Sequence, residues 1–247
     1  MPAWHYRPAK DIHLSGHDRL ISPLRESGPA SNALRFITWH ITAAYLRIAH
    51  RLTVLGARNL PRQLPFVMIA NHCSHLDAIV LACTISPGLR ASLLPIAAGE
   101  RFFRSSTRAA ASALLLNALP LWRSRTGHTA LANLRKRLVE EPCAYIIFPE
   151  GTRSRSGAIA PFKHGVGMLL AGSPVPVVPC HLTGTHAALP PGTCLPRLRR
   201  LTVRIGPQRC YAALEQTREA WRAIGDDLFT AIRDLANTPA RINQRGP

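Results

Sequence analysis

The sequence predicts a single α/β domain with a largely parallel central sheet flanked by helices, preceded by an N-terminal amphipathic helix. Short β-rich runs alternate with stretches of helical spacing of roughly 10 to 15 residues, the pattern of strands joined by crossover helices. Two polar clusters, "NHCSHLD" and "FPEGTRS", each come directly after one of these runs. Because ligands bind at the carboxyl ends of the strands in such sheets, we expect both clusters to share one cleft.

The N-terminal part of the chain divides into two segments. Residues 1–30 are polar and broken by proline and glycine, and we expect a poorly ordered tail there. Residues 31–56 contain a predicted amphipathic helix, because apolar residues recur every three or four positions from Phe36 to Leu55, opposite a basic face. We assign this segment to a membrane interface, and packing against the protein's own core is the alternative.

Residues 57–247 are predicted to form the α/β domain. Strands are expected in six β-rich runs, at residues 64–71, 92–98, 118–122, 143–151, 174–182 and 200–206. Helices are expected between and after them, at residues 76–85, 104–116, 127–140, 165–172 and, as one or two helices, 211–235.

The net charge of +18 limits the classes of partner. The chain has 31 basic residues against 13 acidic ones, and all but three of the basic residues are arginine. Such a surface attracts anionic lipid headgroups or nucleic acid. A nucleic-acid-binding protein would interleave aromatic and basic residues, yet the chain has only 7 Phe, 4 Trp and 4 Tyr. We therefore expect an anionic membrane surface as a partner and no nucleic acid.

Cysteine usage and hydropathy indicate an intracellular protein without a membrane span. The six cysteines form no CxxC pair and three lie in apolar runs, which is typical of reduced, buried thiols. The N-terminus has no apolar signal-peptide core. The charge-free run from Ala109 to Trp122 has 14 residues, fewer than the roughly 20 that a spanning helix needs.

The cluster "NHCSHLD" allows three chemical interpretations. As a general base, His72 has an unperturbed pKa of about 6.5, and Asp77 lies five residues on, within reach of its Nδ1. As a metal site, His72, His75 and Asp77 would lack the second His/Asp cluster needed to complete it. As a nucleophile, Cys73 would point away from its neighbour His72. We prefer the first interpretation and expect no metal.

Four sequence motifs, in order, resemble those of a known family. The matching residues are Asn71, His72, Ser74 and Asp77 for NHxSxxD, Phe148–Ser154 for FPEGTRS, Phe162, Lys163 and Gly165 for FKxG, and Val175–Pro179 for VPVVP. They resemble the PlsC-type glycerolipid acyltransferases, the lysophosphatidate acyltransferase family. The resemblance covers about residues 50–206.

A further motif of that family, GxIPxDR, is only partly matched. The chain has "NALPLWR" there, which keeps Pro120 and Arg123 but has Asn117 in place of the glycine and Trp122 in place of the aspartate. This departure leaves the acceptor lipid open.

The resemblance implies transfer of a fatty acyl group from a thioester, acyl-CoA or acyl-ACP, to the sn-2 hydroxyl of lysophosphatidic acid. His72 and Asp77 are the expected catalytic pair, and Asn71 and Ser74 are expected to shape the turn around them. The expected substrate-binding residues are Arg123, Glu150, Gly151, Thr152, Arg153 and Lys163. No cofactor is expected apart from the thioester co-substrate.

Arginine suits a phosphate-bearing acceptor because its planar guanidinium pairs with two oxygens at once. Arg123 and Arg153 match the family's phosphate contacts, Lys163 could add a charge, and Glu150 is expected to orient Arg153. An acceptor other than lysophosphatidic acid, such as lyso-ornithine lipid or a lysophospholipid, stays open as the alternative. We expect the protein at the cytoplasmic face of a membrane, as a peripheral or monotopic protein without a transmembrane span, with acyl carrier protein as a candidate partner.

Overall fold

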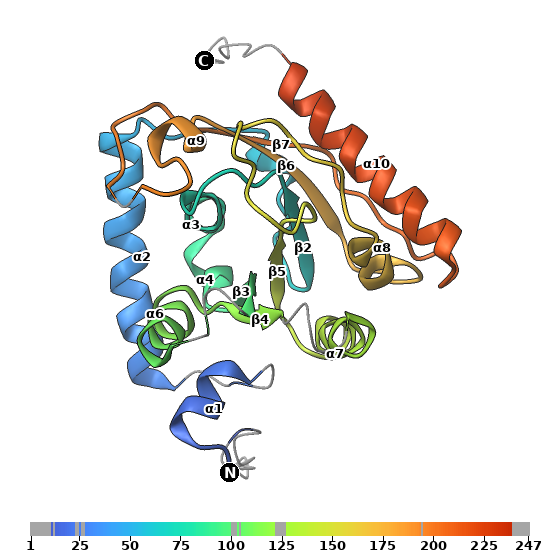
Figure 1. The fold of residues 1–247 in the computed structure, drawn as a ribbon, viewed down its shortest axis with the longest axis horizontal. Helices are drawn as coiled ribbons and strands as arrows, with labels where there is room; N and C mark the ends of the chain where they lie inside the picture. The colour runs from blue at the N-terminus through green and yellow to red at the C-terminus, as the bar shows by residue number, and fades with distance from the viewer. Residues whose placement is uncertain are drawn as a thin grey trace, which may run out of the picture.

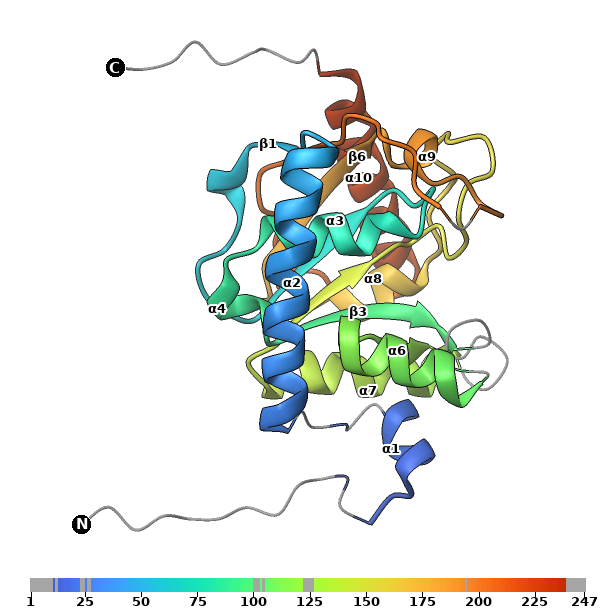
Figure 2. The same cartoon turned by 90° about the vertical axis from the view of Figure 1, so that its left-hand side faces the viewer.

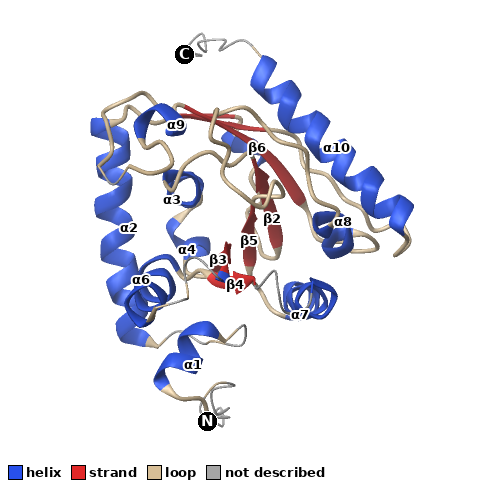
Figure 3. Cartoon of the chain, in the orientation of Figure 1, coloured by secondary structure: helices blue, strands red, loops and turns tan. Residues whose placement is uncertain are grey.

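The computed structural model describes residues 11, 13–22, 25, 28–99, 103, 105–121, 127–193 and 195–238. Seven strands of this part of the chain form one sheet in the order β1-β7-β6-β2-β5-β3-β4 (Figures 1 and 3). They are β1 (Thr53–Leu55), β2 (Phe66–Ala70), β3 (Leu93–Ala98), β4 (Leu119–Leu121), β5 (Ala144–Ile147), β6 (Val177–Thr183) and β7 (Thr202–Ile205). Neighbouring strands are parallel except for the antiparallel pair β6 and β7. The predicted α/β class with a largely parallel sheet is confirmed.

Helices cover both faces of the sheet, as Figure 1 shows. One side carries α2 (Pro29–Ala49), α3 (Leu76–Thr84), α4 (Pro87–Arg90) and α6 (Ser106–Leu116). The other side carries α7 (Gly127–Glu140), α8 (Gly165–Leu170) and α10 (Arg218–Asn237). The short pieces α1 (Gly16–Ile21), η1 (Ala57–Asn59) and α9 (Thr185–Ala188) lie in the connecting segments.

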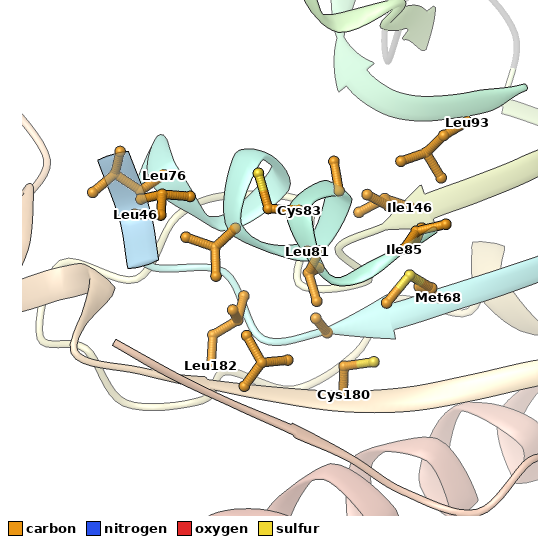
Figure 4. Close-up of a cluster of buried hydrophobic side chains, with 14 of the residues drawn as sticks. Leu46, Met68, Leu76, Leu81, Cys83, Ile85, Leu93, Ile146, Cys180 and Leu182 are labelled. Carbon is orange, nitrogen blue, oxygen red and sulfur yellow. The ribbon is translucent and has the colours of Figure 1, made fainter. Parts of the chain in front are cut away.

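The central strand β2 is buried on both faces. Because successive side chains of a strand point to opposite sides, its residues divide between two apolar clusters. Phe66 and Met68 belong to the apolar cluster under α2 and α3, whereas Val67 and Ile69 belong to the cluster under α8 and α10. Figure 4 shows the first cluster, with Met68 of β2 near Leu81 of α3. A strand buried on both faces reads as a continuous apolar run, so "FVMIA" lacks alternation.

All six strands and all five helices predicted within residues 57–247 are present, with ends shifted by a few residues. The last helix begins only at Arg218, where Thr217 caps it by accepting a hydrogen bond from the N–H of Ala220. The charge-free run at residues 109–122 divides between α6 and β4. In the described part of the chain, no helix combines the length and the apolar character needed to cross a bilayer.

The predicted N-terminal helix is present, but its bounds differ from the prediction. The predicted helix from Phe36 to Leu55 starts earlier and ends earlier: α2 has Pro29 in its first turn, and Arg51, at φ +48°, follows its end. Residues 53–55 form β1 instead, because they pair with β7 across nearly 150 residues of sequence, a long-range contact that local periodicity does not reveal. The sheet therefore begins before residue 57, and α2 buries four residues, with α3 and α6 as its main neighbours.

The segment expected to be a poorly ordered tail contains ordered contacts among its described residues. Residues 16–21 form α1, whose N-cap Ser15 accepts a hydrogen bond from the N–H of Asp18. Arg25 is buried, and its Nη2 donates to Asn117 Oδ1 at 3.1 Å and to the carbonyl oxygen of Ala118 at 3.0 Å. These long-range bonds hold the segment before α2 against the end of α6.

The backbones of helices α8 and α10 approach each other closely at Gly167. A Cβ atom at this position would overlap the backbone of Trp221 in α10. Glycine is therefore required at this position for steric reasons, although it is an unfavourable residue inside a helix.

We predict that Gly167→Ala lowers the free energy of unfolding by about 1 to 3 kcal/mol, because the new methyl group pushes α10 away from α8. Urea denaturation followed by circular dichroism would measure the change. The matched control is Gly225→Ala within α10, where a Cβ atom would meet no other heavy atom within 4 Å. This control should be neutral or stabilising by up to about 1 kcal/mol. Equal effects of the two substitutions would contradict the packing argument.

Candidate active site

Two loops meet at the carboxyl edge of the sheet, where β2 and β5 are neighbours. The His72 loop (residues 71–75) connects β2 to α3, and the Glu150 loop (residues 148–164) connects β5 to α8. The N–H of Ser154 donates to the carbonyl oxygen of His72 at 2.8 Å, and the N–H of His72 donates to Glu150 Oε1 at 2.7 Å. The parallel pairing of the strands thus places the two polar clusters in direct contact.

His72 and Asp77 form a pair in which Asp77 is buried and His72 is partly exposed. The Nδ1 of His72 lies 2.9 Å from Asp77 Oδ2, and the side chains are 18% and 0% exposed. The same Oδ2 accepts the N–H groups of Cys73 at 2.7 Å and Ser74 at 2.8 Å. Asp77 Oδ1 is buried and accepts no hydrogen bond from a described residue, so Oδ2 carries these contacts alone.

This arrangement decides which nitrogen of His72 can act as a base. An ionised carboxylate can only accept, so the neutral ring carries its proton on Nδ1 and donates it to Asp77. The lone pair is then on Nε2, the nitrogen that faces away from Asp77. The arrangement is chemically suited to remove a proton at Nε2 while Asp77 stabilises the imidazolium that results.

A contact that the sequence did not predict holds one face of the imidazole, whereas Asp77 contacts its edge at Nδ1. The ring of Phe148 stacks on His72 with centroids 4.1 Å apart and planes 17° from parallel. Phe148 comes from the Glu150 loop and so fixes His72 from the neighbouring strand end. The only signal for it was its place as the first residue of FPEGTRS.

Asn71 and Ser74 connect the His72 loop to the rest of the sheet edge. The side chain of Asn71 donates to the carbonyl oxygen of Leu182 at 3.1 Å and accepts from its N–H at 2.8 Å, so it joins β2 to β6. The hydroxyl of Ser74 donates to the carbonyl oxygen of Leu189 at 2.9 Å and accepts from the N–H of Leu76 at 3.1 Å. Both residues shape the turn through backbone groups, at fully or nearly fully buried positions.

Glu150 is placed differently from the expected contact with Arg153. Its Oε1 accepts the N–H of His72, and its Oε2 accepts the N–H of Ala160 at 3.1 Å. Burial raises the pKa of the Glu150 carboxyl to about 7, and the nearby charge of Asp77 also raises it. The two N–H donors favour the ionised form and lower the pKa, but burial is the larger effect. The side chain is 4% exposed, and these contacts make it a positioning residue for the His72 loop.

The alternative chemistries find less support in the geometry. The thiol of Cys73 lies 3.3 Å from the hydroxyl of Thr185, and burial raises its pKa to about 12, so little thiolate is present at neutral pH. Cys73, Cys83, Cys143 and Cys180 are buried free thiols, whereas Cys210 is exposed. Among the described residues, no group of three or more His, Cys, Asp or Glu side chains is arranged to hold a metal ion.

The remaining residues predicted to bind substrate belong to the Glu150 loop, with one exception. Gly151 has φ +71°, and a Cβ atom there would meet the side chain of Lys163 at 3.0 Å, so Lys163 lies across the glycine. Thr152 and Lys163 are exposed, and Arg153 is half-buried one residue before the Ser154 bond to His72. Arg123 lies outside the described residues.

We predict from the raised pKa of Glu150 that wild-type stability falls as pH rises from about 4.5 to about 7, relative to Glu150→Gln. The folded protein holds this proton more tightly than the unfolded chain does, so ionisation of the buried group costs roughly 1 to 3 kcal/mol across that window. The variant has no such group to titrate. Denaturant unfolding of both proteins over a pH series measures the difference, and parallel curves would contradict it.

Comparisons with known proteins point to one family. The acyltransferase family model matches residues 51–183. Human 1-acyl-sn-glycerol-3-phosphate acyltransferase alpha is 32% identical over 148 residues, which are 59% of this chain and 49% of that protein. The human beta enzyme is 30% identical over 160 residues, 65% of this chain and 56% of that protein. The chain spans about half the length of these curated relatives.

A solved structure shares the fold. The crystal structure of the 1-acyl-sn-glycerophosphate (LPA) acyltransferase PlsC from Thermotoga maritima aligns with a TM-score of 0.61 at 22% identity, covering 86% of this chain and 81% of that one. The family match extends over more than half of the chain and includes both the His72 loop and the whole Glu150 loop. The chain therefore belongs to the PlsC-type acyltransferase family.

Proposed function

We propose that the protein transfers a fatty acyl group from acyl-CoA or acyl-ACP to the sn-2 hydroxyl of lysophosphatidic acid, giving phosphatidic acid in phospholipid biosynthesis. The observation that carries the proposal is the His72–Asp77 pair, held where the two motif loops meet. The names of the relatives favour lysophosphatidic acid over another lyso-lipid as the acceptor.

The chemistry needs one base that later acts as an acid. Nε2 of His72 takes the proton of the acceptor hydroxyl as its oxygen attacks the thioester carbonyl carbon. The resulting tetrahedral intermediate breaks the carbon–sulfur bond, and the imidazolium returns the proton to the departing sulfur. The products are an ester and a free thiol, and no acyl-enzyme forms.

Three contacts keep the imidazole ready for this step. Asp77 fixes the proton on Nδ1, Phe148 stacks on the ring, and Glu150 holds the backbone N–H of His72. Preorganisation of this kind places the base within hydrogen-bond reach of the acceptor without reorganisation during the reaction. In this proposal Arg153 binds the acceptor phosphate, and Lys163, which lies over Gly151, adds a second positive charge.

The outer face of α2 supports a place at a membrane surface. Phe36, Ile37, Ile41 and Ile48 are large apolar residues that are 56% to 80% exposed. A stripe of this kind on a basic helix is typical of helices that lie in the interface of a bilayer. An acceptor and a product that are both membrane lipids make this location the functional one.

We expect purified protein to form phosphatidic acid from lysophosphatidic acid, and His72→Ala to lower turnover by roughly 10² to 10⁴ through loss of the general base. Mass spectrometry of products measures both, with lysophosphatidylcholine and lyso-ornithine lipid as competing acceptors and acyl-CoA or acyl-ACP as donor. His75→Ala is the control and should keep its activity, since His75 is a variable position of the motif. A strong preference for another acceptor would make the acceptor assignment wrong, and an active His72→Ala enzyme would do the same for the base.

We also expect Arg153→Ala to lower kcat/KM for the acceptor well over tenfold, about 1.5 to 3 kcal/mol, because a charged contact to phosphate is lost. The KM of the acyl donor should change little. Arg155→Ala is the matched control, since Arg155 is an exposed arginine of the same loop. Unchanged acceptor kinetics in Arg153→Ala would remove this residue from the phosphate site.

A further inference from the structure

A cavity of about 690 Å³ lies on the side of the molecule away from His72. It is bounded by α2, by the segment at residues 57–62 and by the connection from α3 to α4. Phe66, the first residue of β2, lines it, whereas His72 follows the last residue of the same strand. The cavity is therefore at the amino edge of the sheet and takes no part in the chemistry described above.

The described residues that line this cavity are strongly basic. They include Arg47, Arg58, Arg62 and Arg90, and none of them is acidic. Arg90 forms the inner wall: it is 7% exposed, its Nε and Nη2 donate to the carbonyl oxygens of Ala82 and Ile85, and it lies over the ring of Trp39.

The other three arginines are exposed around the cavity. Within the described part of the chain, the side chains of Arg47, Arg58 and Arg62 make no hydrogen bond or ion pair. Burial lowers the pKa of Arg90, and the nearby charge of Arg47 acts in the same direction. Residues 28–99 contain a single acidic residue, Asp77, which the His72 loop already uses. Among the described residues, this group of positive charges is thus left uncompensated.

The apolar stripe of α2 adjoins this basic cavity. At roughly 100° per residue, Ile37, Ile41 and Ile48 project about 160° to 200° from Trp39 on the core side, and His40 and Arg47 project about 80° to 100° from it. The residues facing the cavity therefore lie between the core face and the exposed stripe. A bilayer that receives the stripe would bring its headgroups to the height of the cavity.

We propose that this cavity binds the phosphate-bearing headgroup of an anionic phospholipid, as a second lipid site separate from the catalytic one. The guanidinium groups of Arg58 and Arg62 pair with phosphate oxygens, and Arg47 joins them from α2. The apolar stripe carries the acyl-chain side of the interaction, which selects a lipid in a membrane over a free phosphate.

The place of α2 connects the two sites in space. In Figure 2, α4 and the segment after β1 lie on one flank of α2, and α9 lies on the other. His72 belongs to this second flank, since the Ser74 two residues on is bonded to Leu189 at the end of α9. A lipid bound on the first flank would hold the enzyme on the membrane without being a substrate of the reaction. The proposal can be tested by binding alone, so it does not depend on the proposed activity.

Co-sedimentation of the full chain with vesicles of phosphatidylcholine, with and without phosphatidylglycerol, tests the site. Arg58→Gln combined with Arg62→Gln should lower partitioning onto the anionic vesicles roughly tenfold or more, with little change on neutral ones. Ala57→Trp puts bulk into the cavity without changing the charge and should lower the same preference.

The charge control is Arg218→Gln combined with Arg222→Gln, exposed residues of α10 on the far side of the sheet (Figure 1). It should lower anionic binding by no more than about threefold. Equal losses in the two arginine pairs, or no loss in Ala57→Trp, would overturn the site in favour of general surface charge. Glycerol 3-phosphate in solution should displace the protein poorly from the anionic vesicles. If it bound the protein as strongly as the vesicles do, the lipid assignment would be overturned. His72→Ala should bind vesicles like wild type, so an error in the proposed activity stays distinguishable.

Discussion

The buried carboxylate of Asp77 is the interaction on which the rest of the site depends. One oxygen receives two backbone N–H groups of the His72 loop and faces the imidazole of His72. A buried charge is tolerated only where hydrogen bonds replace water, and these three contacts supply them. The contacts that close the turn from β2 into α3 are thus the same contacts that set the tautomer of the candidate base.

The neighbouring strand end completes the site from the other side. β5 delivers Phe148 to the face of the imidazole and Glu150 to its backbone N–H. Both depend on the parallel pairing of β2 with β5, which brings two loops about 75 residues apart in sequence to one edge. Glu150 therefore acts on the position of His72, whereas in the function we propose the charge that faces the acceptor comes from Arg153 and Lys163.

Helix α2 has three chemically distinct faces. One packs Trp39 and Leu46 into the core, the opposite one exposes isoleucines, and the flank between them contributes Arg47 to the basic cavity. The two interpretations of this helix from its sequence, membrane interface and core packing, are therefore compatible. The two roles use different faces around the axis of α2, so one helix can serve both.

The sequence by itself determined the α/β class, the order of elements from β2 to α10 apart from the short helices α4 and α9, and the spacing of His72 and Asp77, because these follow from local periodicity and from short motifs. It did not reveal β1, the anchoring of Arg25 or the contact of Glu150 with the His72 loop. Each of these joins residues more than 75 positions apart, and no local pattern records such a partner. The basic cavity is of the same kind, since Arg47, Arg62 and Arg90 are ordinary surface arginines in the sequence and become one site only when α2 packs across α3 and α4. Motif chemistry was readable from the chain, whereas the surroundings that tune it were decided by tertiary packing.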